Sequence, residues 1–176
     1  MRLISYYFVI VFSIFSFNNY AQKKTRAYST NNEKAIKYYE ESRIYFSQYK
    51  DKEAEEYIKK AIEKDDNFIE AHSAYAQLLA TQKRFDEAIQ HLKKAISINP
   101  DMYPENHFML ANLGMLTGDY TLAYNSYQKF LSYKYIHPDK KEYAEREIKN
   151  AEFGNESRSK STALQASKYR KCYQYG

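Results

Sequence analysis

The sequence predicts an all-α fold, a solenoid of three helix-turn-helix repeats followed by a C-terminal capping helix. Residues 59–62, Lys-Lys-Ala-Ile, recur unchanged at 93–96, which sets a period of about 34 residues. Within each period the apolar residues recur at helical spacing. The chain has only 4 Gly and 3 Pro among 176 residues, too few for the many turns of a sandwich or a propeller.

The N-terminus has the pattern of a secretory signal peptide. Arg2 gives a positive start, and residues 3–17 are almost wholly apolar. This run is shorter than the roughly 20 residues that a membrane-spanning helix needs. We therefore expect a signal peptide over residues 1–21, cleaved after Ala21, and a linker over residues 22–34. The alternative is an uncleaved N-terminal anchor.

A cleaved signal predicts that the protein is exported, to the periplasm or the periphery of the outer membrane, with any membrane association indirect. Cys172 would then be an odd thiol in an oxidising compartment. A single Cys allows no internal disulfide and no zinc site built on several thiolates.

Three units follow the linker, and one small residue recurs in each of them. Ala54, Ala88 and Ala123 stand at nearly the same interval, where the two helices of a pair approach closely. We place the units at residues 35–68, 69–102 and 104–137, with a one-residue insertion between the second and the third.

Two positions depart from this regularity. Phe130 stands where the first two units have Ala61 and Ala95, so we expect looser helix packing in the third unit. Glu41 and Ser42 place polar residues on an inner face of the first unit, which predicts a terminal repeat with one face toward solvent.

The middle unit resembles the tetratricopeptide repeat (TPR) family. The resemblance rests on residues at the family's spacing: His72, Tyr75, Ala76, Leu79, the run Arg84-Phe85-Asp86-Glu87-Ala88, Leu92, Ala95 and Pro100. It extends over residues 35 to about 153, more weakly in the flanking units. It implies a stack of helix pairs whose first helices line a concave face.

After the third unit, Pro138 and Asp139 begin another helix, since Pro suits the first turn and an acidic residue suits its positive end. We expect this helix to span residues 138–153 and to cap the last repeat. Residues 154–176 are polar and basic, and we expect a disordered tail there. The basic, aromatic end of the tail also fits a patch for nucleic acid or membrane, but a solvated tail is favoured and no nucleic-acid partner is expected.

The net charge of +5 is carried by the ends of the chain. Arg2 contributes within the signal and five basic residues contribute within the tail, whereas acidic and basic residues balance over residues 22–153. Recognition by the folded domain should therefore depend on the shape of a groove rather than on bulk charge.

No arrangement of residues suggests catalysis, a metal or a cofactor. His72 and His107 occupy the same place in two units, which predicts packing residues rather than a metal pair. His91 is expected on an outer helix face. The acidic residues Glu53, Glu55 and Glu56 alternate with lysines at helical spacing, which is typical of a solvated, salt-linked face. We expect no enzyme activity.

The resemblance to the TPR family implies that a protein or peptide segment binds in the concave groove. The groove positions of the family fall on three sets of residues here, one for each unit. They are Ile36, Tyr39, Arg43 and Phe46; then Glu70, Ser73, Gln77 and Ala80; then Glu105, Phe108, Asn112 and Met115. An alternative for Phe46 and Met115 is simple packing against neighbouring helices.

TPR domains that hold the C-terminal carboxylate of a chaperone use a clamp of Lys, Asn, Asn, Lys and Arg. The matching positions in this sequence hold Tyr39, Arg43, Gln77, Glu105 and Met109. The clamp is therefore missing, and the resemblance does not imply binding of chaperone tails.

The exported TPR unit is also similar to the N-terminal module of large bacterial envelope proteins that combine TPR, β-propeller and OmpA-like domains, some of them associated with type IX secretion. This similarity implies a scaffold within a secretion or outer-membrane complex. It raises the hypothesis that the chain is a truncated or frameshifted module of such a protein. The alternative is a module that binds peptidoglycan or another envelope polymer.

Overall fold

The computed structural model describes residues 27–174, with side chains described through Ala163. The expected signal peptide, residues 1–21, lies outside the described residues. Over residues 27–174 the chain forms seven α-helices and no strand. They are α2 (Glu33–Ser47), α3 (Asp51–Lys64), α4 (Ile69–Thr81), α5 (Phe85–Ile98), α6 (Pro104–Thr117), α7 (Tyr120–Leu131) and α8 (Pro138–Gln174).

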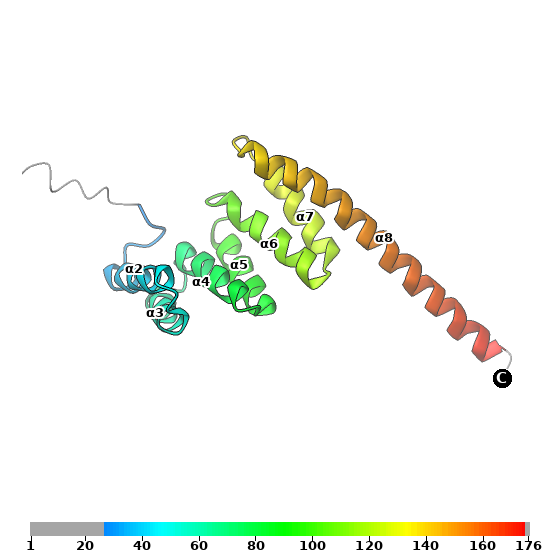
Figure 1. Ribbon diagram of the computed structural model, residues 1–176, viewed down its shortest axis with the longest axis horizontal. Coiled ribbons are helices and arrows are strands. Elements are labelled where there is room, and N and C mark those ends of the chain that lie inside the picture. The colour runs from blue at the N-terminus through cyan, green and yellow to red at the C-terminus, as the bar shows by residue number, and fades with distance from the viewer. Residues whose placement is uncertain (1–26, 175–176) are drawn as a thin grey trace, which may run out of the picture.

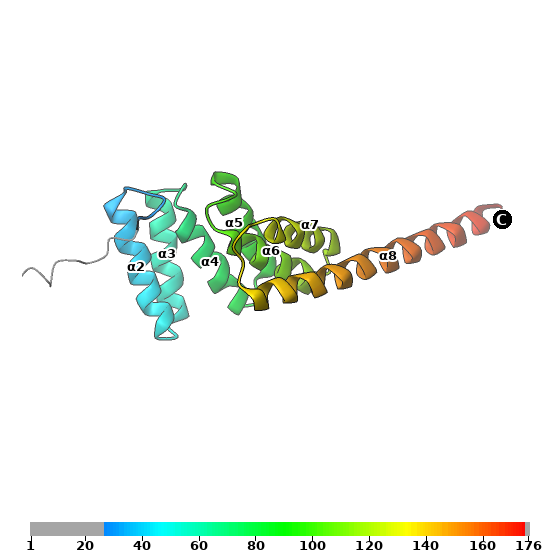
Figure 2. The same ribbon diagram turned by 90° about the horizontal axis from the view of Figure 1, so that it is seen from above.

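Three antiparallel helix pairs, α2–α3, α4–α5 and α6–α7, stack in chain order, and α8 follows α7 (Figures 1 and 2). Ala54, Ala88 and Ala123 have no exposed surface, which agrees with close approach of the paired helices at these positions. The predicted all-α solenoid of three repeats with a C-terminal capping helix is confirmed.

The turn inside each pair uses the same backbone conformation. Tyr49, Lys83 and Gly118 follow the first helix of each pair with φ values of 58°, 61° and 72°. Only the third repeat places glycine in this left-handed region, where a residue without Cβ avoids the steric cost. Gly118 is the C-cap residue of α6.

The interior divides into two apolar clusters. The first extends from α2 to α5 and includes Leu110 and Leu113 of α6, and the second joins α6, α7 and α8. Phe130 belongs to the second cluster and is only 1% exposed, with its ring centre 5.0 Å from that of Phe108. The looser packing expected at Phe130 is therefore not found, because Phe108 and α8 fill the space around this larger side chain.

Ser42 does not face solvent as expected for a terminal repeat. Its side chain is buried, and its Oγ donates a hydrogen bond to the carbonyl oxygen of Ala54, 2.9 Å away. The hydroxyl thus joins α2 to α3 through a buried hydrogen bond. A small polar residue fits there because its one donor has a partner.

The C-terminal helix is longer than predicted. We expected α8 to end at residue 153 and residues 154–176 to be disordered, but the helix continues to Gln174 and extends past α7 (Figure 1). Gly154 does not end the helix but lies within it, against Tyr120 of α7. A Cβ at Gly154 would lie 2.6 Å from ring atoms of Tyr120, so glycine is required by contact rather than by a turn.

Helix α2 begins two residues before the predicted repeat, at Glu33. Asn32 caps it, and its Oδ1 accepts hydrogen bonds of 3.1 Å from the backbone N–H groups of Lys34 and Ala35. Residues 27–32, which we predicted as part of a linker, pack against the first two repeats. We call these residues the strap. Among the described residues, no helix is long and apolar enough to cross a membrane.

Candidate functional site

The first helices of the three pairs, α2, α4 and α6, form what we call the A face, where the sequence placed the groove. A pocket of about 290 Å³ lies on this face between α2 and α4. Four of the predicted groove residues line this α2–α4 pocket: Tyr39, Arg43, Phe46 and Gln77. The other lining residues are Ser42, Ser47, Ala74 and Leu78.

The charges at the pocket are already paired. A guanidinium nitrogen of Arg43 lies 3.1 Å from the Glu40 carboxylate, and the guanidinium carbon lies 5.8 Å from the ring centre of Tyr39. Burial raises the pKa of Tyr39 to about 12, so its hydroxyl is neutral at physiological pH. The pocket therefore offers apolar walls with a few hydrogen-bonding groups rather than a net charge.

Glu70, the first groove position of α4, is not open to a partner. It is 8% exposed, and its carboxylate accepts hydrogen bonds from the strap and from Tyr103. The backbone N–H of Ser29 lies 3.0 Å from Oε1 and the Tyr103 hydroxyl lies 2.5 Å from the same oxygen. The strap thus covers the A face beside the pocket.

In the third repeat, α8 covers part of the predicted groove. Lys140 of α8 lies 3.4 Å from the carboxylate of Glu105, and the ring centre of Tyr143 lies 5.6 Å from that of Phe108. Met115 lines a second pocket of about 590 Å³ between the α6–α7 pair and α8, together with Phe153. These three groove residues therefore contact the capping helix or the space beside it.

The other predicted groove residues are engaged within the repeats. Ile36 and Ala80 are partly buried against the first cluster, and the Ser73 hydroxyl donates to the carbonyl oxygen of Ile69, 2.9 Å away, in its own helix. The Asn112 side-chain oxygen accepts a hydrogen bond from the Tyr127 hydroxyl. Of the predicted groove residues, the four at the α2–α4 pocket lie together around one open space.

Three histidines, His72, His91 and His107, pack within the repeats, but His91 differs from its expected place. His72 and His107 are buried and lie about equally close to the carbonyl oxygens of Asp66 and Pro100, at 3.0 and 3.1 Å from Nε2, as expected for equivalent positions. His91 was expected on an outer face. Instead its Nδ1 lies 2.9 Å from Nδ1 of His72, with the rings stacked.

This contact affects the ionisation of His91. Burial and the neighbouring His72 lower its pKa to about 4, so the ring of His91 is neutral at physiological pH. Within the described residues no group of three or more His, Cys, Asp or Glu side chains is placed to hold a metal ion.

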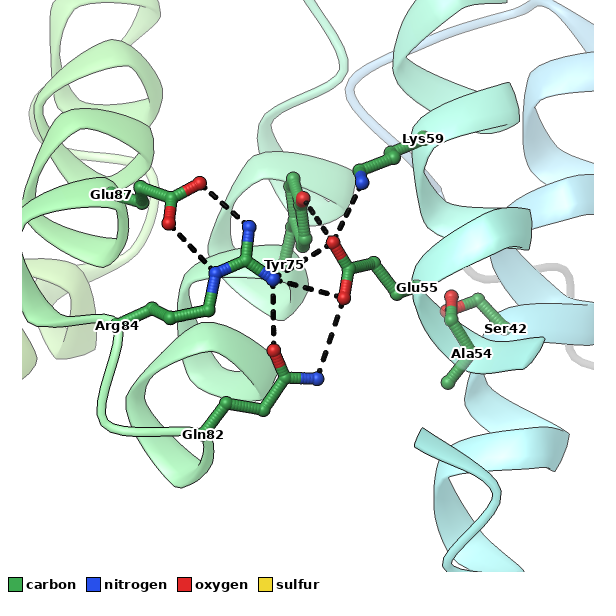
Figure 3. A network of polar contacts seen from close by, with 8 residues as sticks. All are labelled: Ser42, Ala54, Glu55, Lys59, Tyr75, Gln82, Arg84 and Glu87. Atoms are coloured by element: carbon green, nitrogen blue, oxygen red, sulfur yellow. Dashed lines mark hydrogen bonds and ion pairs between the residues drawn. The ribbon is translucent and has the colours of Figure 1, made fainter. Parts of the chain in front are cut away.

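A polar network joins the first repeat to the second, and Glu55 of α3 is its centre (Figure 3). Its carboxylate accepts hydrogen bonds from the Tyr75 hydroxyl at 2.9 Å and from Arg84 at 2.9 and 3.0 Å, and it lies 2.6 Å from the ammonium of Lys59. Arg84 also contacts Glu87. We expected Glu55 on a solvated helix face, but it connects the first repeat to the second through these side chains.

The network fixes the charge of Glu55. Burial acts to raise its pKa, but hydrogen bonds from Lys59, Arg84 and Tyr75 outweigh burial and lower the pKa to about 2. The carboxylate is therefore ionised and fully engaged. This arrangement serves repeat stacking, since the carboxylate oxygens are directed at protein donors (Figure 3).

Residues 69–102, which form α4, α5 and the turn after them, match the family model for the tetratricopeptide repeat. This unit is a TPR. No curated protein matches the sequence as a relative.

Solved TPR domains share the fold of the chain at low sequence identity. The first TPR domain of Spaghetti (RPAP3), bound to the HSP90 peptide SRMEEVD, aligns with a TM-score of 0.62 at 19% identity, over 70% of this chain and 94% of that chain. The N-terminal domain of stress-induced protein-1 (STI-1) from C. elegans aligns with a TM-score of 0.60 at 21% identity, over 70% and 99%. The MamA protein aligns with a TM-score of 0.59 at 20% identity, over 80% and 76%.

The TPR pattern explains which site residues the sequence could place. The resemblance to the TPR family assigned the pocket residues to the A face, because the groove positions of that family recur once in each repeat. The strap and the covering by α8 lie outside the repeat pattern. The one local signal for the strap was Asn32, a residue type favoured as a helix N-cap.

Proposed function

We propose that this protein is a non-enzymatic TPR scaffold that binds an extended or helical segment of a partner protein on its A face. The observation that carries the proposal is the α2–α4 pocket, which brings Tyr39, Arg43, Phe46 and Gln77 around one space of about 290 Å³. The Spaghetti domain, a neighbour in fold, holds a peptide, which supports the same mode of use for this fold.

The pocket favours a segment with an apolar anchor. The apolar walls of the pocket come from Phe46, Leu78 and Ala74. The side chains of Gln77 and Arg43 can form hydrogen bonds with the backbone of a bound segment. Because Arg43 is paired with Glu40, and because the positions of the carboxylate clamp hold other residues, the pocket does not select a chaperone's acidic tail. The ligand class is therefore a neutral, partly apolar segment.

Selection from a displayed library of random peptides tests this proposal. Full-length protein should enrich peptides that share an apolar residue, and the variant R43A/Q77A should lose their binding by about tenfold or more. Arg43 and Gln77 both reach solvent, so their removal should leave the helical fold unchanged.

The matched control is Q90A/K93A, which removes two exposed side chains from α5, the second helix of the second repeat. This variant should bind the selected peptides as the unaltered protein does. Absence of any enriched peptide, or equal loss in the two variants, would contradict binding at the α2–α4 pocket.

The cellular setting is part of the same proposal. The apolar run of residues 3–17 and the similarity to envelope modules support export and a role in a secretion or outer-membrane complex. N-terminal sequencing of the protein from the envelope fraction should give Gln22 as the first residue. Intact Met1 on protein found with the cytoplasmic fraction would contradict export.

A further inference from the structure

The strap, residues 27–32, lies over the starts of α2 and α4, next to the α2–α4 pocket. The ring centre of Tyr28 lies 5.6 Å from that of Tyr39 and 5.7 Å from that of Phe68, edge-on to both. Phe68 has no exposed surface. An aromatic side chain of the strap therefore fills a slot between Tyr39 of α2 and Phe68, the N-cap residue of α4.

The next residue, Ser29, is held by both of its donors. Its backbone N–H lies 3.0 Å from Oε1 of Glu70, and its hydroxyl lies 2.5 Å from Oε2 of the same carboxylate. The hydroxyl oxygen accepts the backbone N–H of Ile69 at 2.9 Å. The Glu70 carboxylate thus accepts hydrogen bonds from both the backbone N–H and the side-chain hydroxyl of one residue. Only Ser or Thr offers this pair of donors at such a spacing.

The following residues complete a short recognition sequence. Thr30 is 6% exposed, and its hydroxyl donates to the Asp65 carboxylate. The side-chain amide of Asn32 donates to the carbonyl oxygen of Lys64, 2.9 Å away. On the other side of the site, Tyr103 from the loop before α6 donates to Glu70. The protein groups that face the strap come from both the first and the second repeat.

We propose that Tyr39, Phe68, Glu70 and Tyr103 form a recognition site for an extended aromatic–Ser–Thr segment, which the strap fills within the chain and which a partner segment of the same pattern can fill in its place. The inference rests on the proposed function at one point, since Tyr39 belongs both to this strap site and to the α2–α4 pocket. A partner peptide that follows the A face from the pocket toward the strap site meets Tyr28 directly. The strap is therefore an internal competitor that limits access to the A face.

Competition within the chain favours the strap. A short tether gives an attached segment an effective concentration in the millimolar range, so a free peptide of similar affinity cannot displace it at micromolar concentration. Weakening the strap should remove this advantage. The site should then bind an added peptide whose sequence matches residues 22–32.

The experiment uses the full chain and a fluorescent peptide of residues 22–32, with binding followed by fluorescence anisotropy. The variant Y28A/S29A should bind the peptide at least about tenfold more tightly than the unaltered chain does. A peptide carrying the same two substitutions should not bind. Adding Glu70→Gln to the variant should weaken the peptide's binding by about tenfold, because the amide that replaces the carboxylate lacks one of the two acceptor oxygens that the strap uses.

A matched control removes the same types of side chain at the other end of the domain. Ser132→Ala combined with Tyr135→Ala changes two exposed residues after α7 and should leave the weak peptide binding of the unaltered chain as it is. If Y28A/S29A loses helicity, Ser29→Ala alone serves instead, and it should give a smaller gain in peptide affinity.

Equal peptide binding by the strap-weakened and the unaltered chain would overturn the inference, as would binding that Glu70→Gln leaves unchanged. This outcome is distinct from failure of the proposed function. Peptides selected on the α2–α4 pocket depend on Arg43 and Gln77, which lie outside the proposed strap site, so their binding is measured separately with R43A/Q77A.

Discussion

The two apolar clusters of this solenoid fill equivalent positions of the repeat with different types of side chain. The first is built mainly from alanine and aliphatic side chains, and Leu92 and the nearby Ala95 have no exposed surface in the second repeat. The second is rich in aromatic side chains, with Tyr127 and Phe130 almost fully buried at the equivalent positions of the third repeat. The position within the repeat decides whether a side chain is buried. The neighbouring side chains decide how large the buried side chain can be.

The difference follows from what lies next to each cluster. The first cluster spans the border between two repeats, and the Glu55 network adds polar contacts across that border. The second is bordered by α8, whose Tyr143 approaches Phe108. Aromatic side chains pack between α6, α7 and α8 in this cluster. The open pocket of the A face lies in the first two repeats.

The largest expected effect comes from removing an aromatic anchor of the second cluster. Phe130→Ala should lower the free energy of unfolding by about 3 to 5 kcal/mol, because a ring that is 1% exposed leaves a cavity that α8 cannot close. Urea denaturation followed by circular dichroism measures this change. Phe153→Ala, at a ring that is 72% exposed, should change stability by less than about 0.5 kcal/mol. Similar losses in both variants would show that the second cluster is not a packed core.

The Glu55 network is the next test, because it belongs to the first two repeats only. Glu55→Gln should cost about 2 kcal/mol, since Arg84 and Tyr75 lose a charged acceptor. The folded pKa of about 2 lies below the ordinary value of 4.5. The stabilisation is therefore present above pH 4.5 and is lost as the pH falls through about 2.

Denaturation at several pH values between 2 and 7 checks this prediction. The stability of the Glu55→Gln variant should vary less with pH in the acid range than that of the unaltered protein. Glu56→Gln is the matched control, because Glu56 makes only an exposed pair with Lys60, and its stability should follow the unaltered protein. If Glu55→Gln lost stability at acid pH as steeply as the unaltered protein does, the Glu55 carboxylate would not be a stabilising contact between the first two repeats.

A smaller effect is expected from the stacked pair of histidines. The folded pKa of His91 is lowered from 6.5 to about 4, so the unfolded chain binds more protons between these values and stability falls as the pH drops from 6.5 toward 4. These two pKa values correspond to ~2 kcal/mol between pH 7 and pH 5, and solvent screening of this half-buried ring reduces the expected contribution of His91 to about 1 kcal/mol. His91→Gln keeps a hydrogen-bonding group beside His72 and should reduce this loss, as thermal melts at the two pH values would show. If the loss of thermal stability between the two pH values were the same in His91→Gln, the ionisation of His91 would not be its cause.

The smallest effect should come from the end of α8. The side chains of residues 159–163 are exposed, and the helix runs away from α7 in both views (Figures 1 and 2). Truncation after Ala163 should therefore change the free energy of unfolding by less than about 0.5 kcal/mol. A loss larger than about 1 kcal/mol would show that the far part of α8 contributes to the second cluster.

Much of the fold could be predicted because helical repeats are encoded locally. The period of about 34 residues and the recurrence of Ala54, Ala88 and Ala123 place six of the seven described helices in pairs. The resemblance to the TPR family placed Tyr39, Arg43, Phe46 and Gln77 on one face, and they line one pocket. Phe130 shows the limit of this reasoning, because its departure from the repeat pattern suggested loose packing, while its tertiary neighbours make it a core residue.

The sequence by itself determined the fold class of the protein and the spacing of its helices, since each depends on residues within one repeat. The tertiary structure alone decided that α8 continues past Gly154 along Tyr120, that His91 meets His72, and that Ser29 binds Glu70. These contacts join residues far apart in the chain, and no local period carries information about them. Their existence depends on the angle at which repeats stack, which is fixed only when all the side chains pack together.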